Sequence, residues 1–233
     1  MRYLVRKSEE RGYFENDWLK SFHSFSFSEY YDPNYMGYKE LRVINHDFIE
    51  KGQGFPMHGH RDMEIITYVL NGTVEHQDSL GNKAQTKAGD VQVMTAGRGI
   101  RHSEYNPDVS QDLELLQIWL LPSEKSLNPG YRQRFYSRDE KLNQLLLIAS
   151  PEGEHGSMTI ASQAKLYAAV VTSAKKIEHS TNTSAGYWVQ VARGEVQVND
   201  ISLKTGDGLA LEELEMLELK SNSEAEVLVF EML

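Results

Sequence analysis

The chain contains no cysteine among its 233 residues. This absence excludes disulfide bridges, metal sites built on thiolates and cysteine nucleophiles in a single step. Any bound metal must therefore be held by histidine and carboxylate side chains. Eight histidines are present for that role.

Basic residues and long apolar runs are also scarce. Lys and Arg number 24 against 34 Asp and Glu, a formal charge of −10, which argues against a surface for nucleic-acid phosphates. The longest apolar runs, such as residues 145–149, fall far short of the roughly 20 residues that a membrane-spanning helix needs. The first ten residues carry no apolar core of the kind found in signal peptides. We therefore expect a cytoplasmic protein that contacts neither membrane nor nucleic acid.

Short β-rich runs separated by glycine and asparagine turns make up the region between residues 39 and 121. Their spacing of about ten residues indicates an antiparallel sandwich or barrel. Similar runs resume at residue 144 and continue to residue 230. The expected fold is all-β with few short helices. In the first half, the expected strands are residues 41–44, 63–70, 74–77, 91–94 and 113–121.

The chain is expected to divide near its middle. Residues 127–131 have the chemistry of a connecting turn, and Ser137 and Glu140 have the spacing of a capping box before a short helix. We place the boundary there and predict two domains, residues 1–136 and residues 137–233.

An internal repeat indicates that the two domains are copies of one fold. Residues 67–75, followed by Gly89, align with residues 189–197, followed by Gly206. Each copy reads as a strand, a turn glycine, a second strand, and a Gly-Asp turn that leads into a third strand.

Two triplets carry the strongest chemical signal: His58-Gly-His60 and His102-Ser-Glu104. On a strand, side chains two residues apart point to the same face, about 7 Å apart, so each triplet presents two ligand groups together. Three imidazoles and one carboxylate suit Fe(II), and also Zn, Mn, Ni, Cu or Co, and they leave coordination positions open. A divalent ion with one carboxylate ligand keeps a net positive charge, which favours an anionic oxygen ligand such as an enolate or phenolate.

The remaining histidines are not expected to bind metal. His23 and His76 are expected to be structural or to support the ligands, whereas His46, His155 and His179 are expected at the surface. A lone His-x-His pair is a weak motif, and the turn glycines around these triplets are what strengthen it.

These motifs resemble those of the cupin superfamily and, within it, the pirin family. The first cupin motif is Gly52, then His58 and His60, then Glu64, reaching Gly72; the second comprises Gly89, Gly99, His102 and Asn106. Five further strings resemble the short bacterial pirins, so that the resemblance spans essentially the whole chain: residues 21–27, 30–33, 41–45, 74–79 and 99–104. It implies a bicupin, two tandem cupin-type β-sandwich barrels, with metal in the first and a degenerate second barrel without metal.

The resemblance also implies a ligand set and an activity. His58, His60 and His102 match the imidazole ligands, and Glu104 matches the carboxylate that pirins place two residues after the third histidine. Many other cupins use the glutamate of the first motif, here Glu64; we favour Glu104 because the match includes the whole string 101–104. Short bacterial pirins resemble quercetin 2,3-dioxygenases, which implies one divalent metal per chain, Fe(II) foremost, and cleavage of a flavonoid-like substrate by dioxygen with release of carbon monoxide. Glu104 would also act as the general base.

Two other functions remain open from the sequence. One is a non-catalytic metal- or redox-sensing regulatory protein that binds a protein partner. The other is a non-oxidative cupin, such as an isomerase or decarboxylase. Arg98 and Arg101 are candidates for pairing with a substrate anion, and six aromatic residues could line a pocket or pack as core: Phe22, Phe25, Phe27, Tyr30, Tyr31 and Tyr35.

Overall fold

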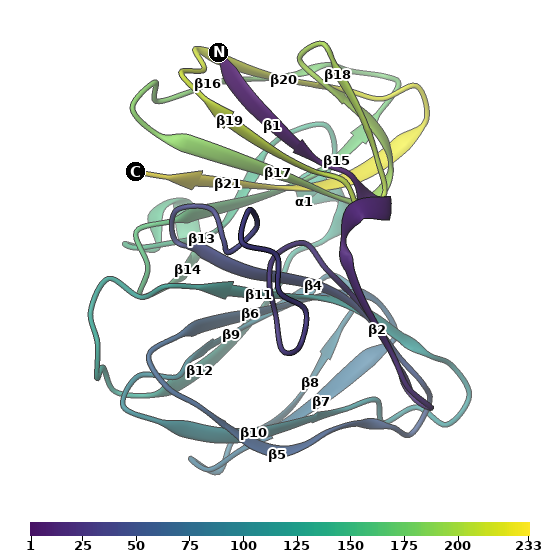
Figure 1. Ribbon diagram of the computed structural model, residues 1–233, viewed down its shortest axis with the longest axis vertical. Coiled ribbons are helices and arrows are strands. Elements are labelled where there is room, and N and C mark those ends of the chain that lie inside the picture. The colour runs from purple at the N-terminus through teal and green to yellow at the C-terminus, as the bar shows by residue number, and fades with distance from the viewer. The chain divides into compact units, whose positions relative to one another are not determined.

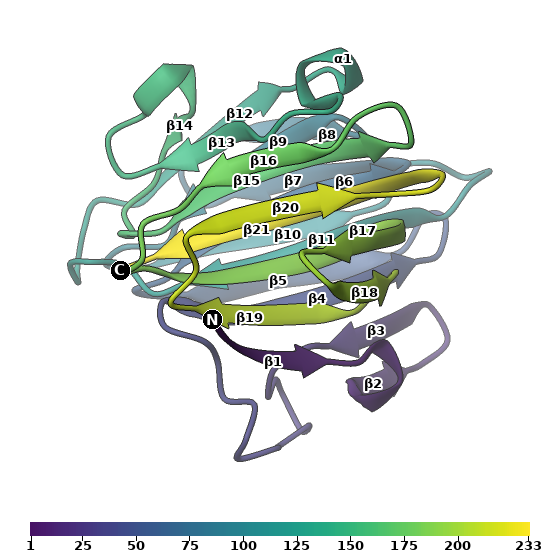
Figure 2. The same ribbon diagram turned by 90° about the horizontal axis from the view of Figure 1, so that it is seen from above.

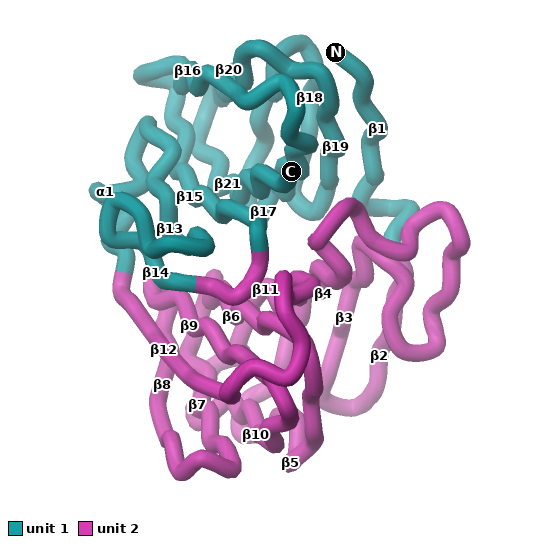
Figure 3. The backbone as a smooth tube through the Cα atoms, turned by 90° about the vertical axis from the view of Figure 1, so that its left-hand side faces the viewer, with its two compact units in different colours: residues 1–11, 136–159, 163–233 teal, residues 12–135, 160–162 magenta.

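The computed structural model describes residues 1–233, almost all of them in strands and turns (Figure 1). Two compact units are present (Figure 3). One comprises residues 12–135 and 160–162, and the other comprises residues 1–11, 136–159 and 163–233. The predicted all-β, two-cupin architecture is confirmed. No helix in the chain combines the length and the apolar character needed to cross a membrane.

The unit built on residues 12–135 contains two antiparallel sheets, which are seen apart in Figure 1; Figure 2 views the same strands from above. The larger one has seven strands in the order β12 (Gly130–Phe135), β9 (Asp90–Thr95), β6 (Glu64–Asn71), β11 (Leu113–Leu120), β4 (Leu41–Ile49), β3 (Leu19–His23) and β2 (Gly12–Glu15). The smaller one has four strands in the order β5 (Gly54–His60), β10 (Ile100–Tyr105), β7 (Thr73–Asp78) and β8 (Lys83–Lys87).

The other unit is one strongly bent sheet system. Its main path runs β1 (Arg2–Arg6), β19 (Gly208–Glu212), β17 (Gly186–Val198), β21 (Glu224–Met232), β15 (Lys165–Thr172), β13 (Leu146–Ser150) and β14 (Met158–Thr159). Three shorter strands complete it: β16 (Ile177–Ser180), β18 (Ile201–Lys204) and β20 (Met216–Lys220). Its helices are single turns: η1 (Ser8–Glu10), α1 (Arg138–Lys141) and η2 (Glu154–Gly156).

Strand β17 serves both layers of its unit because it bends at a bulge between Val191 and Arg193. Its first half pairs with β19 and its second half pairs with β18 and β20. The sequence predicted two strands here, and the structure joins them into one. The apolar core of the unit lies between these layers and includes Tyr187, Leu217 and Leu219.

The predicted repeat has a structural counterpart at its glycines. Gly72 and Gly194 adopt φ values of 82° and 78°. In each, an added Cβ would meet a carbonyl oxygen at or just before the start of a long strand. At Gly72 it would lie 3.0 Å from the oxygen of Asp112, and at Gly194 it would lie 2.1 Å from the oxygen of Glu224. Only glycine accepts both the left-handed backbone and this close approach. The two positions are therefore equivalent turns in two copies of one topology.

The unit boundaries differ from the predicted ranges at the start of the chain. Strand β1 pairs with β19 over the register Arg2–Glu212 to Arg6–Gly208, so residues 1–11 belong with the C-terminal half. Near the middle, the division falls between residues 135 and 136. There Ser137 caps α1 in the predicted capping box with Glu140.

Candidate metal centre

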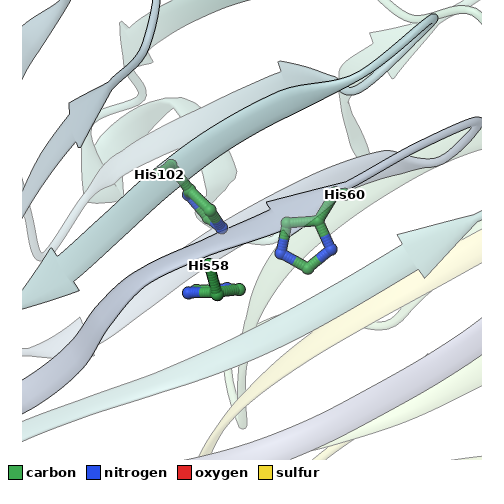
Figure 4. Close-up of side chains that lie close together, drawn as sticks. All are labelled: His58, His60 and His102. Carbon is green, nitrogen blue, oxygen red and sulfur yellow. The ribbon is translucent and has the colours of Figure 1, made fainter.

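Three imidazoles converge from two neighbouring strands, β5 and β10 (Figure 4). His58 and His60 lie two residues apart on β5 and so share a face, and His102 of β10 is directly opposite His58 in the antiparallel register. The ring centroids are 4.7 Å apart for His58 and His60, 4.5 Å for His58 and His102, and 4.8 Å for His60 and His102. One ligand nitrogen from each lies within 4.8 Å of the others, as a shared ion requires.

Two imidazoles of this cluster, those of His60 and His102, are kept neutral by their surroundings. Burial, followed by the neighbouring histidines, lowers the pKa of His60 to about 4 and that of His102 to about 3. A neutral imidazole has a free lone pair, which is the form that binds metal. The Nε2 atom of His102 is buried without any hydrogen-bond partner, and Nδ1 of His58 lies 2.8 Å from the carbonyl oxygen of Pro56. The donor Nδ1–H of His58 therefore leaves its Nε2 lone pair for a ligand, and the cluster fits a divalent metal ion.

A hydrogen-bonded chain fixes the orientation of His102. Its Nδ1 lies 3.4 Å from Nδ1 of His76, and Nε2 of His76 lies 3.2 Å from Oδ2 of Asp78. Since the carboxylate only accepts, Nε2 of His76 donates to Asp78, which leaves Nδ1 of His76 to accept from Nδ1 of His102. His102 then presents the lone pair of Nε2 to the cluster. His76 and Asp78 thus support the ligand, as predicted for His76.

Glu104 lies on the same strand as His102, and its carboxylate is held by three neutral donors. Thr67 and Gln92 donate to Oε1 at 3.1 and 2.9 Å, and Gln117 donates to Oε2 at 2.5 Å. Glu104 forms a second group of possible ligands with His76 and His102, in which all three side chains are buried. Both nitrogens of His76 already have hydrogen-bond partners, so the group of His58, His60 and His102 is the better metal site.

The three donors to Glu104 were missed by sequence reasoning. Gln92, Thr67 and Gln117 face one another across β9, β6 and β11 in register, although they lie 25 residues apart or more in sequence. No local spacing links them. The only sequence signal is a polar residue at the centre of each otherwise apolar strand.

Glu64 lies away from the histidine cluster. The chain turns between β5 and β6, where Asp62 has a φ of 49°, so His60 and Glu64 do not share one regular strand. Its Oε2 accepts a hydrogen bond from the backbone N–H of Ala161 at 3.1 Å, and burial raises the pKa of its carboxyl. The alternative ligand considered from the sequence therefore does not face the site.

A cavity of about 460 Å³ opens beside the cluster, and His58, His60 and His102 form part of its wall. Its apolar lining is largely aromatic and includes Trp18, Phe27, Phe55 and Trp119. The ring centroid of Trp119 lies 5.0 Å from that of His60 and 5.3 Å from that of Phe27. Of the aromatic residues singled out from the sequence, Phe27 therefore lines the cavity, whereas Phe25 is buried in the core and Tyr31 is exposed.

Several other predicted positions fall outside the cavity. Arg98 and Arg101 are exposed and do not line it. His46 was expected at the surface, but it is 4% exposed and its Nε2 lies 2.9 Å from Oε1 of Glu114. It sits in the middle of β4, whose central position in the sheet buries both faces. His155 is exposed and His179 is half-buried.

The equivalent position of the other unit has a different chemistry. Strands β16 and β20 pair there as β5 and β10 do, and His179 is opposite Leu217 where His58 is opposite His102. Leu217 and Leu219 belong to the apolar core of that unit. Both groups of three possible ligands lie in the unit of residues 12–135.

Comparisons with known proteins agree with this architecture. The model of the Pirin family matches residues 4–120, and that of the quercetinase C-terminal cupin domain matches residues 147–232. The chain belongs to the pirin family. A relative from Escherichia coli strain K12, named quercetin 2,3-dioxygenase, is 46% identical over 228 residues, covering 98% of this chain and 97% of the relative. A pirin-like protein of Caulobacter vibrioides is 36% identical and covers 92% of this chain and 93% of its own.

Solved structures show the same fold. The crystal structure of the bacterial pirin YhhW from Escherichia coli in complex with nickel(II) superposes with a TM-score of 0.94 at 44% identity, covering 99% of each chain. A quercetin 2,3-dioxygenase from Acinetobacter baumannii has a TM-score of 0.77 at 22% identity, covering 98% of this chain and 85% of its own. The second likeness concerns the fold alone.

Proposed function

We propose that this pirin is a metal-dependent dioxygenase that cleaves the heterocyclic ring of flavonols such as quercetin and releases carbon monoxide. The observation that carries the proposal is the position of three converging imidazoles on the wall of a largely aromatic cavity. Its volume of about 460 Å³ lies within the range of small-molecule sites. The names of the relatives support the substrate class.

His58, His60 and His102 would hold one divalent ion, with Glu104 as the fourth ligand. The expected ion is Fe(II); Ni, Zn, Mn, Cu and Co suit the same donors, and a related pirin is known with nickel(II). When bound, the ion supplies Lewis acidity for an anionic substrate oxygen and a template for dioxygen.

The protein's own residues would orient and deprotonate the substrate. Glu104 takes the proton of the flavonol 3-hydroxyl as general base, and Thr67, Gln92 and Gln117 hold its carboxylate in position. Trp119 and Phe27 pack against the planar rings and exclude water from the reacting centre.

The open cavity favours this activity over a non-catalytic sensing protein. A site whose only role is to hold or sense a metal needs no adjoining space for a ring system, whereas His58 and His60 both face such a space. Dependence of turnover on dioxygen separates the dioxygenase from an isomerase or decarboxylase that uses the same ion.

The test is turnover of quercetin, followed by loss of its absorbance, in air and under anaerobic conditions. Protein reconstituted with Fe(II) or Ni(II) is compared with the double variant His58→Ala, His60→Ala. We expect consumption that requires both dioxygen and the intact histidines. Stoichiometric metal binding without any flavonol consumption would reject the proposed activity and favour the sensing protein.

A further inference from the structure

The cavity has a second polar wall, apart from the metal ligands. Ser21 and His23 of β3 face Asp47 and Asn45 of β4 in register, and all four side chains line the cavity. They are 2 to 4% exposed. Gln117 of β11 continues this wall, because it pairs with Asn45 in the sheet register and donates a hydrogen bond to Glu104.

The hydrogen bonds of this wall have a defined direction. Ser21 Oγ donates to Oδ1 of Asp47 at 2.5 Å, which uses its only proton. Nε2 of His23, 2.9 Å from Ser21 Oγ, must then be the donor to that oxygen. Ser21 is therefore oriented toward the carboxylate and is not activated as a nucleophile. Its role is to hold Asp47, whose Oδ2 stays available as an acceptor.

Asp47 is a carboxyl group buried without an opposite charge. No lysine or arginine is among the groups that shift its pKa, which burial raises to about 7 and the bond from Ser21 offsets only in part. Beside it, Asn45 Oδ1 and Gln117 Oε1 are buried acceptors with no hydrogen-bond partner. Buried acceptors of this kind are costly unless something donates to them. Two such acceptors beside a buried carboxyl group on one cavity wall indicate a ligand that brings hydroxyl donors.

We propose that Asp47 and Asn45 form a subsite that binds a hydroxyl group on an aromatic ring of the substrate, on the part of the molecule that does not reach the metal. The aromatic cavity lining supplies the ring contact, and the buried acceptors supply the hydrogen bonds. Above about pH 7, where Asp47 is ionised, a phenolic hydroxyl donates to it in a charge-assisted bond, which is about twice as strong as a neutral one. This inference rests on the proposed function, since it assigns selectivity among flavonols to the same cavity.

The test compares two flavonols that bind metal through the same oxygens. Quercetin carries further ring hydroxyls and 3-hydroxyflavone carries none. Dissociation constants are measured anaerobically by tryptophan fluorescence for the nickel-loaded wild type, Asp47→Asn, Asn45→Ala and the control Asp200→Asn, which changes an exposed turn of the other unit. We expect the wild type and the control to prefer quercetin by about tenfold or more, and Asp47→Asn to lose most of that preference while keeping its affinity for 3-hydroxyflavone. Asn45→Ala, which keeps the carboxylate of Asp47, should lose part of the preference for quercetin.

The outcomes separate the subsite from the activity. Suppose that quercetin is consumed but both cavity variants still bind it more tightly than 3-hydroxyflavone, or lose affinity for the two flavonols equally. The subsite is then overturned and the activity stands. If the wild type binds neither flavonol, the activity fails, and catechol alone then decides the subsite by the same fluorescence assay. Catechol binding that requires Asp47 supports the subsite, and absent or Asp47-independent binding overturns it. Melting temperature and nickel content show whether each variant is folded.

Discussion

The ring of His102 is one end of a chain of hydrogen bonds that runs through His76 to Asp78. Such partners fix the tautomer and the angle of a ligating imidazole, and their loss commonly costs a factor of about 10 to 100 in metal affinity. His76 is fully buried and stacks on Tyr131, with ring centroids 4.5 Å apart, so its position is set by packing as well. The chain therefore ties the strength of the metal site to a residue that does not touch the ion.

Replacing His76 by phenylalanine keeps the ring and removes both nitrogens. We expect the nickel dissociation constant of His76→Phe, measured by competition with a chelator, to rise about 10- to 100-fold. The control is His46→Phe, which removes another buried histidine of the same unit, one bonded to Glu114. Equal nickel affinity in the two variants would show that the chain has no part in metal binding.

The buried carboxyl of Asp47 makes stability depend on pH. Its pKa is about 7 in the folded protein, against an ordinary value of 3.8, so the folded state already binds a proton at a pH where the unfolded chain has lost it. The ionised carboxyl therefore costs stability as pH rises through this window, and the cost is complete above about pH 7, at an upper bound of about 4 kcal/mol.

The variant Asp47→Asn removes this titration. Relative to wild type, its free energy of unfolding should increase between about pH 4 and pH 8, as measured by denaturant titration of the metal-free proteins. His60 and His102, with their lowered pKa values, act in the opposite direction but equally in both proteins, so the difference isolates Asp47. A difference that does not change with pH would contradict the raised pKa.

At the scale of elements, the close approach of β5 to β10 decides which of the two glycines of β5, Gly54 or Gly59, cannot be replaced by a residue with a side chain. A Cβ at Gly54 would lie 2.2 Å from the carbonyl oxygen of Glu104 and 2.5 Å from Cα of Tyr105. A Cβ at Gly59, between the two histidines, meets nothing nearer than 3.8 Å. The strands can therefore accept a side chain inside the His-Gly-His motif but not at the start of β5.

We expect Gly54→Ala to lower the melting temperature by several degrees and to weaken nickel binding, because β5 must move away from β10. Gly59→Ala should retain both properties close to wild type. Calorimetry and nickel titration of the two variants check this pair. The reverse order of effects would show that the register of β5 and β10 is wrong.

Element-scale patterns explain what the sequence could predict of the site. The spacing within His58-Gly-His60 and within His102-Ser-Glu104 is local, so alternation along a strand was enough to place each pair on one face. Glu64 was only the alternative ligand. It shares a face with His60 only if the strand is regular between them, and the turn at Asp62 interrupts the strand there. Thr67, Gln92 and Gln117, and likewise Asp47 with Ser21, meet only through pairing of distant strands, for which the sequence contains no local signal.

At the scale of the whole molecule, the strand pattern and the turn glycines were sufficient to predict two β units. The pairing of β1 with β19 was beyond prediction, because it joins segments about 200 residues apart and β1 carries no mark of its partner. The domain ranges 1–136 and 137–233 accordingly remain a simplification of the two units.

The two units are expected to differ in metal binding. In the C-terminal unit His179 is opposite Leu217, and apolar side chains fill the interior. We expect native mass spectrometry to find one nickel ion per wild-type chain and none in the variant His58→Ala, His60→Ala. A second tightly bound ion, or an ion that survives in the double variant, would place metal elsewhere in the molecule.

The most direct test of ring cleavage is the amount of carbon monoxide released per quercetin consumed, with dioxygen uptake recorded in parallel. For metal-loaded wild type, we expect one carbon monoxide and one dioxygen for each flavonol, and neither product nor uptake above background for His102→Ala. Flavonol loss without carbon monoxide, or loss that continues unchanged in His102→Ala, would contradict ring cleavage at the three-histidine site.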